Sequence, residues 1–595
     1  MKLITSTFFL LCNVFAISFT GIAQTVTGPE GEIFSVRVVK ANLGDPWEVI
    51  YGPDDSLWVT EARGYKVSRV DPVTGGQTVL LDLTSLRNFP RYDKIANSTD
   101  GDKPWPQGGL MGMALHPDLL GAKPYVYLAY VHTYSGSGAN SSSNGCLSNA
   151  GGCFFTTRIV RYTYSSGALT SPVTLCDTIP GSSDHNSGRM MIAPVGGTDF
   201  LFYSVGDMGG GQFASAARTI RSQQTNSYEG KILRFNLEID ADAGTYDRWL
   251  PDDNPYNGTK ESAVWSIGHR NPQGLKYAVV GGVGSIYSSE HGPFSDDEIN
   301  IIENGKNFGH PLVIGYNDNN YNGKAAGASN TSTAPGTHNS SAPIITSENT
   351  NATAIGATFK APIFSLYSAT TTELNTPWNN TIANGYDNNN PWKSEGPSGM
   401  DVYQSTAIPG WNNSLLITTL KGGKLVRLKL NAAGDAITGD TFNYFKAANR
   451  YRDLAISTDG TKIYLAVDSN SITSGPSATN PQVSTNRGSI LEFTYTGGAT
   501  MPLRLRNNNS PEQKKHVIAI YPNPAGNSVT VDLDKNMRRP YRYQLYDVSG
   551  RMVLENTTDK NTFRIDVTSL KRGVYIIRLY NGFGVEFDRD KIVLQ

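Results

Sequence analysis

The chain has little cysteine, little net charge and few long apolar runs. It contains 4 cysteines among 595 residues, charged residues make up 17% of it, and its formal net charge is −1. A chain so close to neutrality creates no global field for nucleic acid or for an anionic membrane, so neither is expected as a partner. It also lacks a CxxCH haem motif, so electrons from any redox reaction must leave through a separate acceptor.

An apolar run at the N-terminus resembles an export signal. Met1-Lys2 supplies a positive start, Phe8–Thr20 supplies the apolar stretch, and Gly21-Ile22-Ala23 supplies small residues suited to cleavage. The stretch is short for a membrane helix, and no later one approaches the roughly 20 residues that a span needs. The sequence therefore predicts a signal peptide over residues 1–23 and an exported protein.

Export makes a disulfide bond chemically reasonable. Cys12 lies in the predicted signal, Cys146 and Cys153 bracket a loop rich in glycine, asparagine and serine, and Cys176 is left over. We expect a Cys146–Cys153 bridge that staples this loop. No metal site is expected there, because no nearby set of cysteines and histidines completes four ligands.

A hairpin pattern recurs six times along the chain. A strand, a turn rich in Asp, Pro or Gly, and an aromatic-rich strand occupy residues 47–60, 109–131, 189–206, 274–288, 399–419 and 453–467. A further strand follows each copy, at residues 65–71, 157–164, 230–237, 297–303, 423–430 and 488–495. Such repetition indicates radial blades. We predict an all-β fold with a six-bladed β-propeller over residues 24–498; two stacked sandwiches would explain the strands but not six matched units.

Other segments depart from the blade pattern. Two polar insertions, residues 317–351 and 370–395, have a composition that cannot bury a core, so we expect surface loops that either decorate the protein or overhang its active face. Residues 499–516 form a polar linker, and residues 517–595 form a compact all-β segment with turn signals. This last segment is expected to be a small C-terminal β-sandwich.

Five polar segments follow one another along the chain: WPQGGLMGMALHPD at 105–118, DHNSGR at 184–189, the run 266–300 containing GHRNPQG and EHGPFSDDE, KGGK at 421–424 and NRYRD at 449–453. In this order they resemble the soluble quinoprotein sugar dehydrogenases of the glucose/sorbosone type, which use pyrroloquinoline quinone (PQQ) and calcium. The resemblance covers roughly residues 35–497. It implies oxidation of the anomeric hydroxyl of an aldose to the lactone, and it is compatible with a homodimer.

The tail has a resemblance of its own. YPNPAGNSVTV, YQLYDVSGRMV and LKRGVYIIRL resemble the C-terminal sorting domain of the type IX secretion system of Bacteroidetes. This implies that the protein crosses the periplasm and is secreted or attached to the cell surface, with the secretion machinery as a partner. The alternative is a small carbohydrate-binding β-sandwich.

Oxidation of a sugar hydroxyl needs a base for the proton and an acceptor for the hydride. No side chain accepts hydride, so a cofactor is required. His185 is the candidate base, because an ordinary imidazole is largely neutral at pH 7, and the adjacent Asp184 can orient it. The resemblance implies the same role for His185 and adds Gln107 and Arg270 to the catalytic group.

PQQ carries three carboxylates, so its pocket needs fixed positive charge. Arg270, Lys421, Arg450 and Arg452 supply this charge, and guanidinium groups suit planar carboxylates. Residues i and i+2 of a strand face the same side, so Arg450 and Arg452 can reach one ligand; the alternative is a pair of solvated surface arginines. The resemblance adds Asn271 and Gln212 to the cofactor contacts.

Calcium prefers oxygen ligands, including backbone carbonyls. The resemblance implies that Gly292 and Pro293 offer carbonyls to the ion that bridges protein and quinone. Asp296, Asp297 and Glu298 form a separate acidic cluster that is either a solvated turn or part of a structural calcium site. The resemblance implies the following metal-site residues: Asp297, Glu298, Phe308, Ile314, Tyr316 and Asp318.

Departures from the usual glucose dehydrogenase pattern leave the sugar open. Asn186 and His291 stand where glutamines are usual, and the insertions have no counterpart. Two other classes also suit a calcium-dependent propeller, a lactonase or related hydrolase and a non-catalytic glycan-binding protein. The combination of His185 with four cationic positions favours the dehydrogenase.

Overall fold

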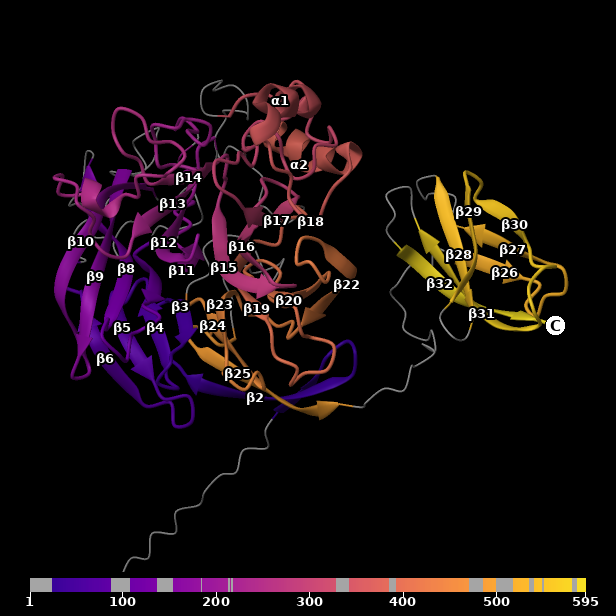
Figure 1. Ribbon diagram of the computed structural model, residues 1–595, viewed down its shortest axis with the longest axis horizontal. Coiled ribbons are helices and arrows are strands. Elements are labelled where there is room, and N and C mark those ends of the chain that lie inside the picture. Colours follow the sequence, from indigo (N-terminus) through magenta and orange to yellow (C-terminus); the bar gives the residue numbers. More distant parts are fainter. Residues whose placement is uncertain are drawn as a thin grey trace, which may run out of the picture. The chain divides into compact units, whose positions relative to one another are not determined.

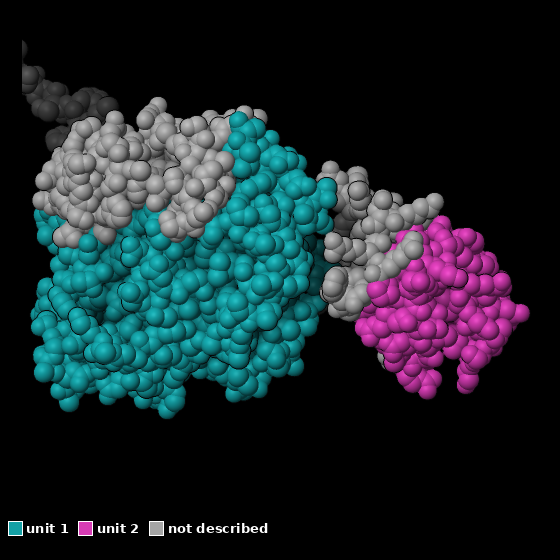
Figure 2. Space-filling model, turned by 90° about the horizontal axis from the view of Figure 1, so that it is seen from above, with its two compact units in different colours: residues 1–499 teal, residues 500–595 magenta. Residues whose placement is uncertain are grey.

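The structure is a computed structural model in which the chain divides into two compact units, Met1–Ala499 and Thr500–Gln595 (Figures 1 and 2). It describes residues 24–86, 108–135, 154–182, 184–211, 215, 218–327, 342–384, 392–469, 485–498, 517–533, 540–547, 551–580 and 586–595. The predicted signal peptide, the linker and the Cys146–Cys153 bridge lie outside these residues. Cys176 is described, and it is buried and free. The all-β prediction is confirmed, since strands dominate both units.

Unit 1 contains six antiparallel sheets in its described residues. The first is β3 (Pro46–Tyr51), β4 (Leu57–Glu61), β5 (Lys66–Val70) and β6 (Gln77–Asp82). The second is β7 (Leu110–Leu115), β8 (Tyr125–Ser135), β9 (Phe154–Ser165) and β10 (Ala168–Gly181), and the third is β11 (Met190–Val195), β12 (Thr198–Val205), β13 (Lys231–Asn236) and β14 (Val264–Ile267).

The other three sheets follow the same order. The fourth is β15 (Pro272–Val280), β16 (Val283–Glu290), β17 (Asp297–Ile302) and β18 (Phe364–Leu366), and the fifth is β19 (Pro397–Tyr403), β20 (Ser414–Thr419), β21 (Leu425–Leu430) and β22 (Ile437–Tyr444). The sixth joins β23 (Tyr451–Ile456), β24 (Lys462–Val467) and β25 (Ile490–Gly498) to two strands from the start of the chain, β2 (Glu32–Lys40) and β1 (Gln24–Thr27).

The six sheets contact one another in a closed cycle. The first strand of each sheet contacts the first strand of the next, in the order β3, β7, β11, β15, β19, β23 and back to β3. Each neighbouring pair also shares a buried hydrophobic cluster. This explains why strand β4, Leu-Trp-Val-Thr-Glu, is buried at every residue: it is covered on both faces.

The sixth sheet depends on the N-terminal segment. Strand β2 pairs with β25, and Glu32 on β2 accepts hydrogen bonds from Trp411 Nε1 at 2.9 Å and from the Tyr444 hydroxyl at 2.7 Å in the fifth sheet. The N-terminal strand β2 therefore connects the sixth sheet to the fifth through these hydrogen bonds.

The two insertions form more structure than their composition predicts. Helix α1 (Glu348–Ile355) begins at the N-cap Ser347, and helix α2 (Thr371–Asn384) follows β18. Both lie on the same side of unit 1 (Figure 1). Leu374 of α2 joins Phe294 and Trp392 in a hydrophobic cluster of buried side chains, with Trp378 packed against it. The prediction of plain surface loops is therefore wrong for these parts, because scattered aromatic and aliphatic side chains suffice for a local core.

Unit 2 contains two sheets in its described residues. One has β26 (Val517–Tyr521), β27 (Ser528–Leu533) and β30 (Thr562–Asp566); the other has β28 (Tyr541–Asp547), β29 (Met552–Thr558), β31 (Gly573–Tyr580) and β32 (Glu586–Leu594). One hydrophobic cluster draws on strands of both sheets and on no residue of unit 1. Across the described part of the chain, no helix is long and apolar enough to cross a membrane.

Candidate active site

The loop that carries His185 connects the second and third sheets. Asn186 fastens this loop to itself: its Oδ1 accepts a hydrogen bond from Ser182 N at 2.9 Å, and its Nδ2 donates to Ser182 O at 2.8 Å. His185 adopts a φ of 47°, in the left-handed region that residues other than glycine rarely occupy. A Cβ atom at residue 206, directly after β12, would lie 2.0 Å from the His185 carbonyl oxygen, so this residue must be glycine.

The carboxylate that orients the imidazole is Asp207. His185 Nδ1 lies 2.7 Å from Asp207 Oδ1, whereas Asp184 Oδ1 lies 3.9 Å from His185 Nε2 and accepts a hydrogen bond from the His185 backbone N–H. Because a carboxylate accepts, Nδ1 carries the proton and Nε2 is left as the basic nitrogen. Sequence reasoning missed Asp207, although its place directly after a buried strand, in VGDMGG, was a usable signal.

Asp207 has a second imidazole partner. His310 Nε2 lies 2.9 Å from Asp207 Oδ2, and the backbone N–H of Gly209 donates to Asp207 Oδ1 at 2.9 Å. Burial alone would raise the pKa of Asp207, but the contacts with the two imidazoles hold that pKa far below its ordinary value. Asp207 therefore stays ionised at neutral pH.

Glu290 fixes the loop that carries Arg270. It accepts hydrogen bonds from the Arg270 backbone N–H and from His269 Nδ1, the latter at 3.0 Å. The guanidinium of Arg270 donates through Nη1 to the carbonyl oxygens of His291 at 3.2 Å and Gly292 at 3.0 Å. Arg270 is thus brought against the turn that is predicted to hold calcium.

Asn271 joins the base loop to that turn. Its Oδ1 accepts hydrogen bonds from Ser187 N at 3.2 Å and Ser187 Oγ at 3.0 Å, and its Nδ2 lies 3.4 Å from His291 Nδ1. The pKa of His291 lies well below its ordinary value, because of burial and of the nearby charges of His185, Arg270 and Arg452. The predicted base and two of the predicted cofactor-binding arginines, Arg270 and Arg452, therefore lie close to His291, at the start of the predicted calcium turn.

The two arginines of NRYRD are buried, so they are not solvated surface residues. Arg452 forms a two-point ion pair with Asp468, with Nε and Nη2 each 2.9 Å from a carboxylate oxygen, and its guanidinium lies 4.3 Å from the centre of the Trp47 ring. Arg452 Nη1 also donates to Gln273 Oε1 at 2.7 Å, and Arg450 Nε lies 3.4 Å from Asp468. Asp468 therefore contacts both guanidinium groups and Trp47 contacts that of Arg452, and sequence reasoning named neither as a site residue.

The segment Trp392–Glu395, at the end of the second insertion, meets both Lys421 and the predicted calcium turn. Lys421 Nζ donates to the Trp392 carbonyl oxygen. Asp297 accepts hydrogen bonds from Gly292 N at 2.9 Å, from Ser394 Oγ at 2.6 Å and from Glu395 N at 2.8 Å. Both oxygens of Asp297 are thus used to tie this segment to the turn, and only glycine fits at 292, where a Cβ would lie 1.8 Å from Ser295 O.

Three buried carboxylates surround the loop at residues 314–316. Glu298 Oε1 accepts from Gly315 N at 2.9 Å, and Glu348 Oε1 accepts from Ile314 N at 2.9 Å. Burial raises the pKa of Asp296 to about 6 and of Glu348 to about 7, and it raises the pKa of Glu298 well above its ordinary value. Glu348 was not predicted, because it lies in an insertion that was expected to be a plain loop.

The remaining predicted metal residues lie in the segment 303–363, which connects β17 to β18. Phe308 is buried and stacks on His269 with ring centres 4.7 Å apart, whereas Tyr316 is 38% exposed and its carbonyl accepts from Asp318 N at 2.8 Å. Asp318 is exposed. Gln107 and Gln212 lie outside the described residues, so their predicted roles stay predictions.

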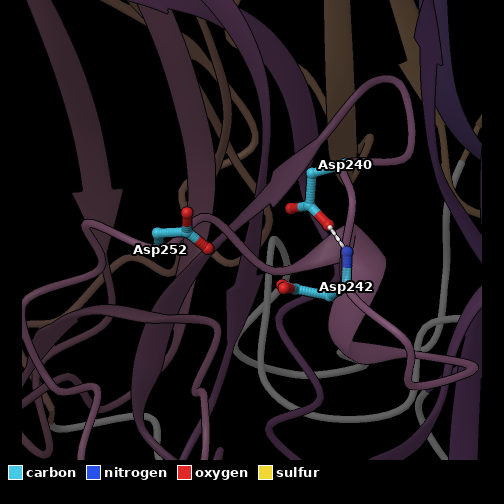
Figure 3. A group of neighbouring side chains, drawn as sticks. All are labelled: Asp240, Asp242 and Asp252. Atoms are coloured by element: carbon cyan, nitrogen blue, oxygen red, sulfur yellow. Dashed lines mark hydrogen bonds between the residues drawn. The ribbon is translucent and has the colours of Figure 1, made fainter.

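Another acidic group lies apart from these residues. Asp240, Asp242 and Asp252 bring carboxylate oxygens within 4.8 Å of one another in the segment after β13, and Asp242 N donates to Asp240 Oδ1 at 3.1 Å (Figure 3). Asp240 and Asp252 are exposed. Exposed carboxylates of this kind are satisfied by water, and they carry no chemistry by themselves.

Comparisons with known proteins bear on both units. Residues 43–365 and 380–473 match the family "Glucose / Sorbosone dehydrogenase", and residues 519–595 match the "Secretion system C-terminal sorting domain". The chain is 33% identical to quinoprotein glucose dehydrogenase B of Acinetobacter calcoaceticus over 498 residues, which cover 78% of this chain and 92% of that protein. It is 24% identical to the aldose sugar dehydrogenase YliI of Escherichia coli, over 73% of this chain and 91% of that protein.

A solved structure shows the same fold. The soluble aldose sugar dehydrogenase of Escherichia coli, in its apo form, superposes on 78% of this chain and 99% of its own with a TM-score of 0.50 and 20% identity. The resemblances read from the sequence are confirmed for both units. The chain belongs to the glucose/sorbosone dehydrogenase family.

Proposed function

We propose that the protein is an exported PQQ- and calcium-dependent dehydrogenase that oxidises the anomeric hydroxyl of an aldose to the lactone. The observation that carries this proposal is that Asn271 connects the loop of a carboxylate-oriented imidazole, His185, to His291, whose carbonyl oxygen accepts a hydrogen bond from the buried guanidinium of Arg270. A sugar oxidation needs both, because the imidazole takes the hydroxyl proton and the cationic group binds an anionic redox cofactor.

The donor set suits PQQ. Three of the cationic side chains are buried, those of Arg270, Arg450 and Arg452, and Lys421 is half-buried. Guanidinium groups bind planar carboxylates through paired hydrogen bonds, so this group of cations suits a planar ligand that carries several carboxylates. The chemistry that the quinone supplies when bound is acceptance of the hydride from the anomeric carbon.

His185 acts as the base from its Nε2 atom. Its Nδ1–H bond to Asp207 selects this tautomer and stabilises the imidazolium that forms when the sugar hydroxyl loses its proton. Asp207 therefore takes the orienting role that the sequence suggested for Asp184. Asn271 links the base loop to the turn at 291–293, which keeps the base in register with the cofactor.

Two calcium sites belong to the proposal. The carbonyls of Gly292 and Pro293 would hold the ion at the quinone, with Asp297 fixing the turn through Gly292 N. Glu298, Glu348 and Asp318, with carbonyls of Phe308, Ile314 and Tyr316, would hold a structural ion. The support is chemical: Glu298 and Glu348 are buried carboxylates with raised pKa values, Asp296 is a neighbouring buried carboxylate of the same kind, and a divalent cation would favour the ionised forms of all three.

The architecture fits the same proposal. The closed cycle of sheets supports a six-bladed propeller, with β2 completing the last blade, and the common core of the two sheets of unit 2 supports a C-terminal sandwich. We propose that this second unit directs export through the type IX secretion machinery, after an N-terminal signal peptide carries the chain to the periplasm.

Reconstitution tests the function. Purified apoprotein should show dye-linked oxidation of at least one sugar in an aldose panel after addition of PQQ with Ca²⁺, and neither component should suffice alone. Activity with neither component, or none with both across the panel, would overturn the proposal. Acid release without an electron acceptor would indicate a lactonase, and sugar binding without either reaction would indicate a glycan-binding protein.

A further inference from the structure

The carboxylate of Asp207 is shared between two imidazoles that come from distant parts of the chain. Oδ1 lies 2.7 Å from His185 Nδ1, and Oδ2 lies 2.9 Å from His310 Nε2. His185, Asp207 and His310 are only 5%, 1% and 4% exposed. Water therefore cannot replace either bond easily, and both oxygens are fixed by the protein.

We propose that His310 is a positioning residue for the dehydrogenase reaction, which holds the carboxylate of Asp207 in the plane that orients His185. The proposal rests on the proposed role of His185 as the base. His310 lies in the segment that connects β17 to β18 of the fourth sheet. His185 precedes β11 and Asp207 follows β12, which are both strands of the third sheet. The fourth sheet would thus contribute to the geometry of a base that another sheet carries.

The backbone around His310 is built to hold the ring in place. His310 N donates to Gly268 O at 3.0 Å, and Gln223 Nε2 donates to His310 O at 2.8 Å. Asp207 is fixed from the other side, because its backbone N–H donates to Arg270 O at 2.7 Å. A carboxylate held at one oxygen can still rotate, and a second donor at the other oxygen removes that freedom.

The chemistry of the pair assigns the proton on His310. An ionised carboxylate only accepts hydrogen bonds, so Nε2 of His310 carries the hydrogen. Nδ1 of the same ring is buried and has no hydrogen-bond partner among the described residues. The Asp207 contact is therefore the polar contact that accounts for a histidine, rather than an apolar side chain, at this buried position.

Loss of the His310 donor should change the base as well as its position. Each hydrogen-bond donor partly neutralises the negative charge of the Asp207 carboxylate. Without the His310 donor, the carboxylate would attract the His185 ring more strongly and would favour its protonated form. The charged and titratable groups around His185 are Asp184, Asp207 and His291, and those around His310 are Asp207, Arg270 and Glu290. Among the described residues, His310 Nε2 is the side-chain nitrogen that contacts Asp207 Oδ2.

Two substitutions at one position test the proposal in the reconstituted enzyme. His310→Phe removes the donor and keeps a flat ring, whereas His310→Gln keeps an N–H donor at a similar reach. We expect His310→Phe to lower kcat by roughly 10-fold or more and to leave KM for the sugar within about twofold. We also expect it to move the acid limb of the kcat/KM profile upward by roughly half to one pH unit, and His310→Gln to restore much of both effects.

A readout without the cofactor comes from the tautomer of the ring. In ¹⁵N-histidine spectra of the apoprotein, the signals that disappear in His310→Gln belong to His310. They should show a ring that is protonated at Nε2 and not at Nδ1. His132→Gln is the matched control, because His132 Nε2 lies 3.2 Å from the backbone oxygen of Asp177, outside the proposed site. This control should leave the kcat/KM profile unchanged.

The outcomes separate this inference from the proposed function. If wild-type protein shows no reconstituted oxidation, the function itself fails. If wild-type protein is active and His310→Phe keeps the wild-type kcat and pH profile, His310 is not a positioning residue. Equal losses in His310→Phe and His310→Gln with an unmoved acid limb, or an Nδ1–H tautomer in the wild type, would reduce it to a packing residue.

Discussion

His185 and Asp207 can be separated from the cofactor-binding residues by substitution. His185→Ala should lower turnover by roughly 10²- to 10⁴-fold, because it removes the base, while quinone affinity stays nearly unchanged. Asp207→Asn should cause a loss of similar order, because an amide can leave the imidazole in the wrong tautomer. Steady-state kinetics and equilibrium titration with PQQ check both. A large loss of quinone affinity in His185→Ala would reverse the assignment.

Arg452 should show the opposite behaviour. Arg452→Ala removes a guanidinium that Asp468 and Trp47 hold in place, and a charge-assisted contact to a carboxylate is worth roughly 1.5–3 kcal/mol. We expect PQQ affinity to fall by roughly 10- to 100-fold, with near-normal turnover at saturating cofactor. Arg37→Ala is the control, because Arg37 pairs with Glu492 in the sixth sheet, away from these contacts.

The functional role of a residue could be predicted only where it follows from the neighbouring sequence. His185, Arg270 and Arg452 stand in short motifs that already carry a charge pattern. Asp207 and His310 do not, since their roles arise from contacts over 22 and 103 positions in the sequence. Asp184 is adjacent to His185 in the chain, but it accepts a hydrogen bond from the His185 backbone N–H and its Oδ1 lies 3.9 Å from the His185 Nε2.

At the level of elements, the six hairpins were predictable and their partners were not. Strands β3 and β4, or β23 and β24, are apolar runs joined by turns rich in Asp and Gly, and their ends lie within two residues of the predicted ranges 47–60 and 453–467. The fourth strands are harder to recognise: β22, for example, is largely exposed and polar. Strand β2 joins the sixth sheet from the other end of the chain, which no local pattern encodes.

The buried carboxylates around residues 314–316 should make the stability of the protein depend on pH and calcium together. Burial raises the pKa of Asp296 to about 6 and of Glu348 to about 7, above the roughly 4 of an unfolded carboxyl group. A raised folded pKa contributes stability that is present below about pH 4 and is lost as the pH rises through about 6 to 7. Apoprotein should therefore melt at a lower temperature at pH 8 than at pH 5.

Calcium should reverse that trend, because it binds the ionised carboxylates. Thermal melts in EDTA and in Ca²⁺ at both pH values check this, and Ca²⁺ should raise the melting temperature more at pH 8. Asp207 does not disturb the comparison, since its pKa is far below this range and it stays ionised throughout. Glu348→Gln should reduce both the pH effect and the calcium effect; equal stabilisation at both pH values would contradict the prediction.

On the scale of the whole molecule, the two units have independent hydrophobic cores. The cluster of unit 2 contains no residue of unit 1, and all described residues of the proposed site lie upstream of residue 499. The closed cycle of sheets in unit 1 is completed by β2 and β25, so it needs nothing beyond residue 498. We therefore expect that neither the folding of unit 1 nor its chemistry requires the second unit.

A chain that ends near Ala499 should consequently fold and keep full quinone-dependent activity. In a host with a type IX secretion system, the truncated enzyme should accumulate, active, in the periplasm, because unit 2 carries the address that the machinery reads. Fractionation of cells followed by activity assays measures this, with the full-length chain as the control. Transfer of residues 500–595 to a periplasmic reporter should deliver the reporter to the cell surface or the medium. Unchanged export of the truncated enzyme would refute the address and favour an accessory binding module.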